Sequence, residues 1–256
     1  MRLIVAMRQL ADLVEELEVD TEGTDIDREF VKFVSNEWDE AALEEALLVK
    51  EAAGAHVTVV ALDEPDVDQT LYTALAKGAD RAVKLTGAPE GWLPTRTRAA
   101  LLAGWLEGET FDAVLTGVQA ADDLDGQLAG LLGARLGLPH AAVVVRVEPA
   151  GDRLAVSQEL GGGTVAEEEI TTPVVLGVQA ARQAPRYAPI TRIRQAMQAG
   201  GLEEVPVGEA PANIGPEVRR LFPPEKTGHA EMLTGAPADV AGKIVELIRA
   251  KGLAKA

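Results

Sequence analysis

Short apolar runs alternate with longer amphipathic runs over the first 180 residues, and this alternation constrains the fold most. The apolar runs have the length of buried strands and cover residues 3–7, 56–62, 81–85, 112–117 and 173–178. Between several of them, apolar residues recur with the period of a helix. Strands that alternate with helices of this length form an open, mostly parallel sheet with helices on both faces. The sequence therefore predicts the α/β class.

Polar residues and glycines indicate where the first helices begin and end. Asn36 is a favoured N-cap residue, and Asp39, three residues later, can return a hydrogen bond to the N–H of Asn36. The helix that follows should end at Gly54, because glycine readily adopts the left-handed conformation of a C-cap. Two further helices are expected over residues 95–107 and 125–137.

The pattern changes after residue 139. Two runs, 141–147 and 154–159, flank a Pro-Ala-Gly-Asp turn and predict a β-hairpin. From about residue 183 the chain is rich in proline and has little amphipathic order. This stretch is too long for an ordinary loop. We therefore predict an α/β domain over 1–183 and a C-terminal arm over 184–256, which ends in an amphipathic helix.

Composition narrows the class of partner. The net charge of −17 argues against nucleic acid and against anionic membrane surfaces. The chain has no cysteine, so disulfides, thiolate catalysis and cysteine metal sites are excluded. No run approaches the ~18 apolar residues of a membrane span, and the apolar start is too short for a signal peptide. We expect a cytoplasmic protein without membrane insertion.

The turn over residues 117–127 is the strongest candidate for a binding site. A strand, a glycine-marked turn and a helix N-terminus in that order can bind an anion, because free N–H groups and the helix dipole point at the turn. The spacing matches neither GxGxxG nor a P-loop, so an ordinary βα turn is the alternative. Asp122, Asp123 and Asp125 could be paired acids for catalysis or magnesium, but helix-capping carboxylates are the preferred interpretation.

Catalytic patterns are missing elsewhere. The histidines, His56, His140 and His229, are scattered and have no metal-binding spacing. No serine elbow occurs, and no nucleophile stands beside a base. The sequence chemistry favours a binding protein without catalytic residues of its own.

Six segments, in their order along the chain, resemble the β (small) subunit of electron transfer flavoproteins. They are residues 6–8, 36–46, 73–82, 117–123, 173–175 and 185–188, which include Asn-Glu-Trp-Asp-Glu, Lys-Gly-Ala-Asp-Arg-Ala, Gly-Val-Gln-Ala-Ala-Asp-Asp and Pro-Arg-Tyr-Ala. Each segment alone is a weak signal, whereas six in the right order are specific.

The resemblance implies a Rossmann-like, adenine nucleotide alpha hydrolase-like fold, with a nucleotide-binding domain over 1–183. It implies a heterodimer in which the large (α) subunit holds most of the FAD and this subunit helps to hold it. In such a pair the small subunit binds AMP as a structural ligand. Electrons pass from flavin dehydrogenases to a downstream acceptor, and the small subunit is not itself an enzyme.

The resemblance also transfers contact residues. The AMP contacts carry over to Ala6, Asn36, Glu37, Trp38, Asp39, Leu62, Asp122, Asp123, Leu124, Asp125, Gly126, Gln127, Leu128, Ala129 and Gly130. The arm should contact the large subunit, and a loop after the last sheet strand should grip the dehydrogenase, with Ile190 as its aliphatic anchor. The basic segment around this anchor adds Arg186, Tyr187, Arg192 and Arg194 as partner-binding residues. A strap that lies on its own domain is the alternative for this segment.

The chain departs from the family pattern at several of these positions. Asp125 stands where threonine is common, Ala129 where glycine is common, and Glu37 where proline is common. Leu13 aligns with an aromatic residue that faces the flavin ring. Because a carboxylate beside a phosphate is unfavourable, Asp125 favours weaker or altered AMP binding.

Three other functions remain open at this point. The first is a bifurcating flavoprotein, in which a second FAD replaces AMP in this subunit. The second is a stand-alone adenine-nucleotide-binding regulatory protein. The third is a nucleotide-dependent hydrolase or transferase that uses Asp122 and Asp123.

Overall fold

The structure, a computed structural model, divides the chain into two compact units. It describes residues 1–14, 16–29, 31–123, 125–208, 216–223 and 230–253. The first unit runs from Met1 to Leu221 and the second from Phe222 to Ala256. The predicted site residues lie in the first unit, apart from Leu124, which falls outside the described residues.

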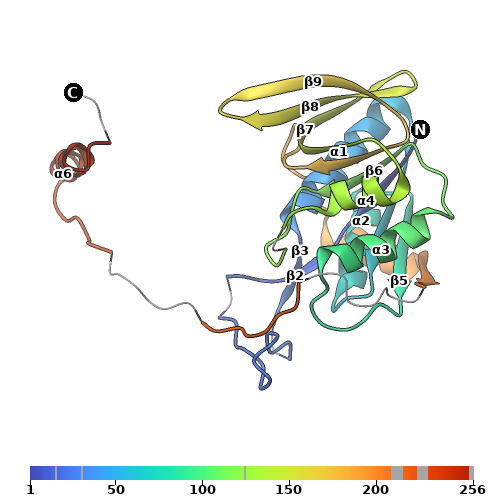
Figure 1. Cartoon of the computed structure of the whole chain (residues 1–256), viewed down its shortest axis with the longest axis horizontal. Coiled ribbons are helices and arrows are strands. Elements are labelled where there is room, and N and C mark those ends of the chain that lie inside the picture. The colour runs from blue at the N-terminus through green and yellow to red at the C-terminus, as the bar shows by residue number, and fades with distance from the viewer. Residues whose placement is uncertain (15, 30, 124, 209–215, 224–229, 254–256) are drawn as a thin grey trace. The chain divides into compact units, whose positions relative to one another are not determined.

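A nine-stranded sheet forms the centre of the first unit, in the order β11-β5-β4-β1-β6-β10-β7-β8-β9 (Figure 1). The parallel strands are β1 (Arg2–Ala6), β4 (His56–Leu62), β5 (Arg81–Thr86), β6 (Ala113–Gly117), β10 (Val174–Val178), β11 (Leu202–Pro206) and the start of β7 (His140–Ala150). The strands β8 (Arg153–Gly161) and β9 (Thr164–Thr171) continue from β7 as an antiparallel extension. The expected open, mostly parallel sheet and the hairpin are confirmed.

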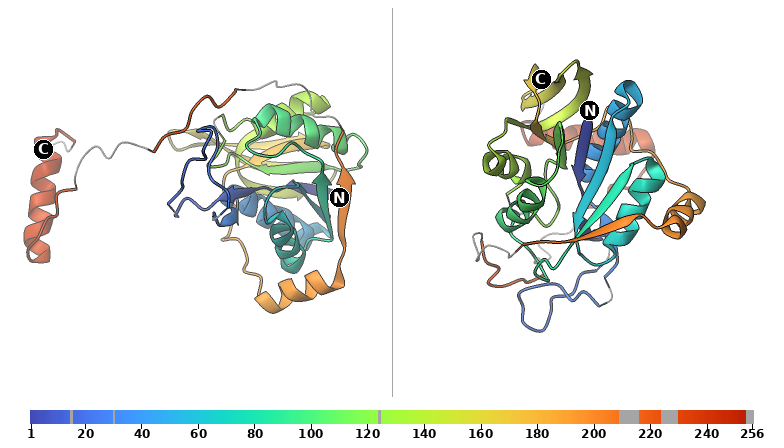
Figure 2. Two further views of the ribbon diagram at one scale, coloured as in Figure 1. Left: turned by 90° about the horizontal axis from the view of Figure 1, so that it is seen from below. Right: turned by 90° about the vertical axis from the view of Figure 1, so that its right-hand side faces the viewer.

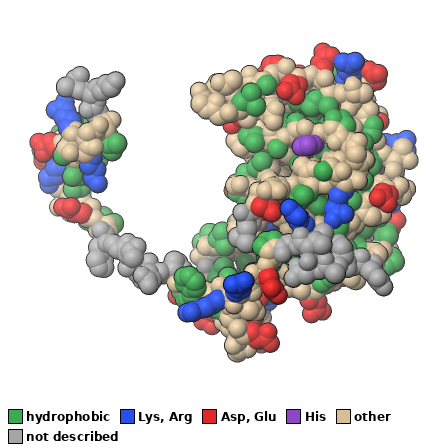
Figure 3. Space-filling view, viewed as in Figure 1, with side chains coloured by type: hydrophobic (Ala, Val, Ile, Leu, Met, Phe, Trp, Pro, Cys, Tyr) green, Lys and Arg blue, Asp and Glu red, His purple; other side chains and the backbone are tan. Residues whose placement is uncertain are grey.

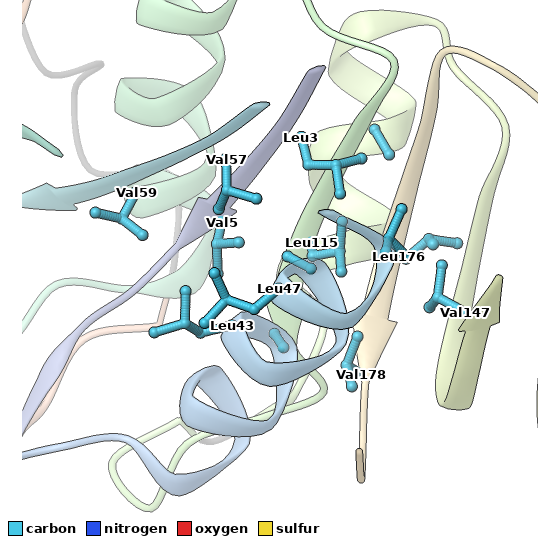
Figure 4. Close-up of a cluster of buried hydrophobic side chains, with 14 of the residues drawn as sticks. Leu3, Val5, Leu43, Leu47, Val57, Val59, Leu115, Val147, Leu176 and Val178 are labelled. Atoms are coloured by element: carbon cyan, nitrogen blue, oxygen red, sulfur yellow. The ribbon is translucent and has the colours of Figure 1, made fainter. Parts of the chain in front are cut away.

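Four helices cover the two faces of the sheet (Figure 2). They are α1 (Glu37–Ala53), α2 (Val67–Lys77), α3 (Thr95–Leu106) and α4 (Leu128–Leu136). Alternation along β1 divides its side chains between two cores, because successive residues of a strand point to opposite faces. Leu3 and Val5 belong to the core under α1 and α2, and Ile4 and Ala6 to the core under α3 and α4. Figure 4 shows Leu43 and Leu47 of α1 against the first of these faces.

A long excursion separates β1 from α1. The strands β2 (Gln9–Ala11) and β3 (Phe33–Ser35) pair antiparallel at its base, and Val19 and Ile26 form an isolated bridge farther out. This excursion extends from the edge of the sheet at which β1 ends, so it borders the site described below.

The first unit extends past the predicted boundary at residue 183. Helix α5 (Ile190–Ala199) lies beside α2, and β11 adds an edge strand parallel to β5. The Arg81 side chain pairs with Glu203 of β11, and Lys84 pairs with Glu204. Sequence patterning missed β11 because it is short, charged and preceded by two glycines, features that the sheet tolerates at an edge.

The second unit contains one helix, α6 (Pro237–Ala250), among the residues described. The expected terminal helix is confirmed, and Ile244, Leu247 and Ile248 form an exposed apolar stripe along it. None of the described helices combines the length and the apolar character needed to cross a membrane.

Candidate functional site

The candidate site lies at the sheet edge where β1, β4 and β6 end. These three strands are adjacent and parallel, so the residues that follow them meet at one edge. This is the edge at which open α/β sheets bind ligands. The first turn of α1 and the turn before α4 close the same region.

Asp39 of α1 connects two of these strands. One carboxylate oxygen accepts the backbone N–H of Arg8 at 3.0 Å, and the other accepts that of Gly117 at 2.9 Å. The side chain is only 3% exposed. Asp39 therefore fixes the end of β1 to the end of β6.

The expected capping box does not form. Asn36 occupies the N-cap position, but its side chain makes no capping bond and donates instead to the Gln119 carbonyl at 2.9 Å. The Asn36 backbone N–H donates to the Arg8 carbonyl, not to Asp39. The prediction was wrong because the side chains of Asn36 and Asp39 bind backbone groups at the strand ends and in the turn after β6. Sequence spacing does not reveal these partners.

Burial makes Asp39 unusual among the acids of the chain. Removal from water raises its pKa to about 7, against the opposing effects of the Arg8 guanidinium and the N–H groups that it accepts. Near neutral pH this carboxyl group therefore gains and loses a proton inside the protein.

Gly117 is required by the same arrangement. A Cβ at this position would lie 2.5 Å from Asp39 Oδ1, 2.8 Å from Trp38 Cβ and 3.0 Å from Asn36 Nδ2. The start of α1 can approach β6 this closely only because residue 117 has no side chain.

Two arginines reach the interior of the site. Arg8 is 5% exposed and forms an ion pair with Asp122, whereas Arg98 is 4% exposed and donates to Glu64 at 2.6 Å. Burial lowers the pKa of Arg8 to about 10, and the positive charge of Arg98 adds to that effect. Arg98 and Glu64 were not foreseen from the sequence, because only the packing of α3 against the sheet brings them together.

The turn before α4 is held by its own carboxylates. Asp123 Oδ1 accepts the N–H groups of Asp125 and Gly126 at 3.1 and 2.8 Å, and Asp125 accepts that of Gln127 at 3.2 Å. Although burial opposes it, these hydrogen bonds lower the pKa of Asp123. The acids thus bind N–H groups of the turn ahead of the helix, and no side-chain hydrogen bond caps α4, so the helix-capping interpretation is wrong. The described residues contain no cluster of three or more potential metal ligands.

The residues expected to contact AMP meet only in part. Ala6, Asp39, Leu62 and Leu128 line one common space, together with Met7, Arg8, Arg98 and Leu102. The volume of this space is about 10 Å³. Glu37 is exposed, while Ala129 packs near Gly177 and Gly130 lies near His140, away from that space. The space that these four residues share is therefore too small for an adenine nucleotide, whereas Asp122 lines the larger cavity beside it.

A larger cavity of about 600 Å³ opens beside this space. Its walls are mainly apolar and include Leu10, Leu13, Phe33 and Trp92, and Arg98 and Asp122 also border it. Acidic side chains are scattered over the visible face of the first unit (Figure 3), in keeping with the net charge of −17.

The predicted partner residues divide into two groups. Arg186 lies against its own domain, where its backbone N–H and guanidinium bind the buried Glu44 of α1 and a second guanidinium nitrogen binds Glu51. Tyr187 and Ile190 are 79% and 60% exposed, and Arg192 and Arg194 are exposed as well. The segment is thus a strap on its own domain that still presents free side chains.

The fold and site define an α/β protein with its binding edge at the carboxyl ends of parallel strands. A model of the electron transfer flavoprotein domain matches residues 25–211. The chain is 35% identical to the electron transfer flavoprotein subunit beta of Methylophilus methylotrophus, over 97% of this chain and 98% of the relative. The corresponding subunit of Clostridium acetobutylicum is 31% identical over 75% of this chain and 74% of the relative. That of Bacillus subtilis is 27% identical over 98% of both chains. The chain belongs to the β-subunit family of electron transfer flavoproteins, and its role is electron transfer.

We expect the stability contributed by Asp39 to depend on pH. Its folded pKa lies above the ordinary value of 3.8, so the contribution is complete below pH ~4 and is lost as pH rises through about 7. The loss amounts to roughly 4 kcal/mol at most. Denaturant unfolding from pH 4 to 8 should show this decline in the wild type and not in Asp39→Asn. Parallel curves for the two proteins would contradict it.

We expect Gly117→Ala to destabilise the protein, because the new Cβ would overlap Asp39 and Trp38. Overpacking of this kind costs about 1–3 kcal/mol. The matched control is Gly104→Ala in α3, where a Cβ meets nothing within 4 Å. That control should stabilise the helix by about 0.5–1 kcal/mol. Thermal unfolding measures both, and equal effects would show that the close approach is unimportant.

Proposed function

We propose that the chain is the small subunit of a heterodimeric electron transfer flavoprotein. It pairs with a large subunit, helps to hold the FAD of that subunit, and contributes to docking of flavin dehydrogenases, from which electrons pass to a downstream acceptor. When bound, FAD supplies the redox chemistry, and this chain supplies structure and contact surface.

The rigid mounting of an exposed apolar residue is the observation that carries the docking part of the proposal. Glu44, which is 1% exposed, accepts both the backbone N–H and the guanidinium of Arg186. Although burial opposes it, the hydrogen bonds from Arg186 lower the pKa of Glu44, so the pair stays charged. Four residues later Ile190 begins α5 with 60% of its surface exposed. An exposed aliphatic side chain on a fixed support suits a small, short-lived interface.

The cavity beside the site supports the flavin part of the proposal. Its volume of about 600 Å³ lies within the range of ligand sites, ~300–1,000 Å³. Leu13, which the family resemblance places opposite the flavin ring, is on its wall. An apolar wall can cover one side of a ring system that another subunit holds.

Co-expression with the large subunit tests the proposal directly. We expect a stable complex that contains one FAD, which a flavin dehydrogenase reduces and a downstream acceptor reoxidises. Spectroscopy and flavin extraction measure both properties. Two FAD per complex would indicate the bifurcating type instead, and failure of the chains to associate would contradict the proposal.

Ile190→Ala should slow reduction of the complex by the dehydrogenase about tenfold, the usual effect of removing an interface anchor. Stopped-flow reduction of the flavin measures this rate. Val165→Ala is the matched control, because Val165 of β9 is also about half exposed but lies outside the strap. An unchanged rate for Ile190→Ala, with the fold intact, would remove the anchor role.

A further inference from the structure

We infer that the buried guanidinium groups of Arg8 and Arg98, held by Asp122 and Glu64, take the position in which the small subunit would bind AMP. The chain then folds and pairs without a nucleotide of its own. This inference rests on the proposed function, since it takes the position of the AMP site from the family.

Little space is left between the ends of β1 and β4 and the start of α4. Ala6, Asp39, Leu62 and Leu128, four of the residues expected around AMP, line about 10 Å³ there, whereas ligand pockets measure ~300–1,000 Å³. A space of ~10 Å³ holds about one water molecule. Arg8 Nε and Arg98 Nε belong to side chains that line this space, are buried and have no hydrogen-bond partner among the described residues. The space is therefore large enough for a water and not for a nucleotide.

The charges around this space also disfavour a phosphate. Two guanidinium groups face Glu64, Asp122 and Asp123, and Asp39 adds a further carboxyl group with a pKa of about 7. The three carboxylates already exceed the two guanidinium groups in number. A phosphate with up to two more negative charges would be repelled at this short range, where burial weakens solvent screening.

The N–H donors of the turn before α4 already have acceptors within the chain. Backbone N–H groups ahead of a helix are the usual partners of a bound phosphate. In this turn Asp123 and Asp125 already accept the N–H groups of residues 125, 126 and 127. A phosphate could bind them only by displacing carboxylates of the chain itself.

The two arginines also hold the strand ends together, which is a role that a bound ligand can have. Arg8 follows β1, Glu64 follows β4, and Asp122 lies in the turn after β6, so the two ion pairs link the ends of three strands and the first turn of α3. Removal of one partner from a buried pair leaves an uncompensated charge and costs about 3–5 kcal/mol. The pairs therefore stabilise the binding edge from within.

A count of released nucleotides tests the inference on the wild-type protein. The complex of the full chain with its large subunit is denatured, and the nucleotides are separated by chromatography and quantified. We expect FAD and less than about one tenth of an equivalent of AMP. About one AMP per complex, in this site or in the neighbouring cavity, would overturn the inference while leaving the proposed function intact. Flavin content and electron acceptance, measured on the same sample, test the proposed function separately.

A variant that opens the site provides the second test. In Glu64→Ala/Arg98→Ala both members of one ion pair are removed, so that no buried charge is left unpaired. We expect at least about tenfold tighter binding of added AMP than in the wild type, measured by calorimetry and by the shift in thermal midpoint. The absence of any gain in a folded variant would overturn the inference. Should the variant not fold, the wild-type count decides alone.

The matched control for that variant is Arg81→Ala/Glu109→Ala. It removes another arginine–carboxylate pair, more exposed than the first, with contacts of 2.8 and 3.1 Å, at the opposite end of the sheet strands. AMP should not affect its thermal midpoint. An equal gain in the control would show that loosening of the protein, and not the opening of this site, admits the nucleotide, and this would also overturn the inference.

Discussion

The carboxyl group of Asp39 is the interaction on which the binding edge depends. It lies out of contact with water, accepts one N–H from the end of β1 and one from the end of β6, and approaches β6 across a glycine. This bridge fixes the backbone of Arg8, and the position of that backbone directs the guanidinium toward the turn after β6. A buried carboxyl that joins two strands thus determines which side chains can enter the site.

Buried acids in the middle of α1 bind distant parts of the chain in a similar way. Glu45 is fully buried and accepts N–H groups from Val147 and Arg182, while its neighbour Glu44 holds Arg186. The charges are compensated by arginines that come from more than 130 residues farther along the chain. One helix therefore carries both the candidate site at its N-terminus and the support of the Ile190 strap farther along.

These two uses of buried charge agree with a subunit whose function is contact and support. Ion pairs of the chain itself link the strand ends at the binding edge, and the strap presents an aliphatic side chain on a fixed base. The apolar cavity beside Leu13 remains open at the same edge. The arrangement suits a protein that covers a cofactor held by another subunit better than one that encloses a nucleotide of its own.

The sequence by itself determined the α/β class, the order of the parallel strands and their helices up to residue 178, and the family, because hydrophobic periodicity and ordered motifs are local properties. Tertiary structure alone decided the partners of Asn36 and Asp39, the place of β11 in the sheet, and the meeting of Arg98 with Glu64. The reason is that these contacts join residues more than 30 positions apart, and neither periodicity nor capping rules extend over that distance.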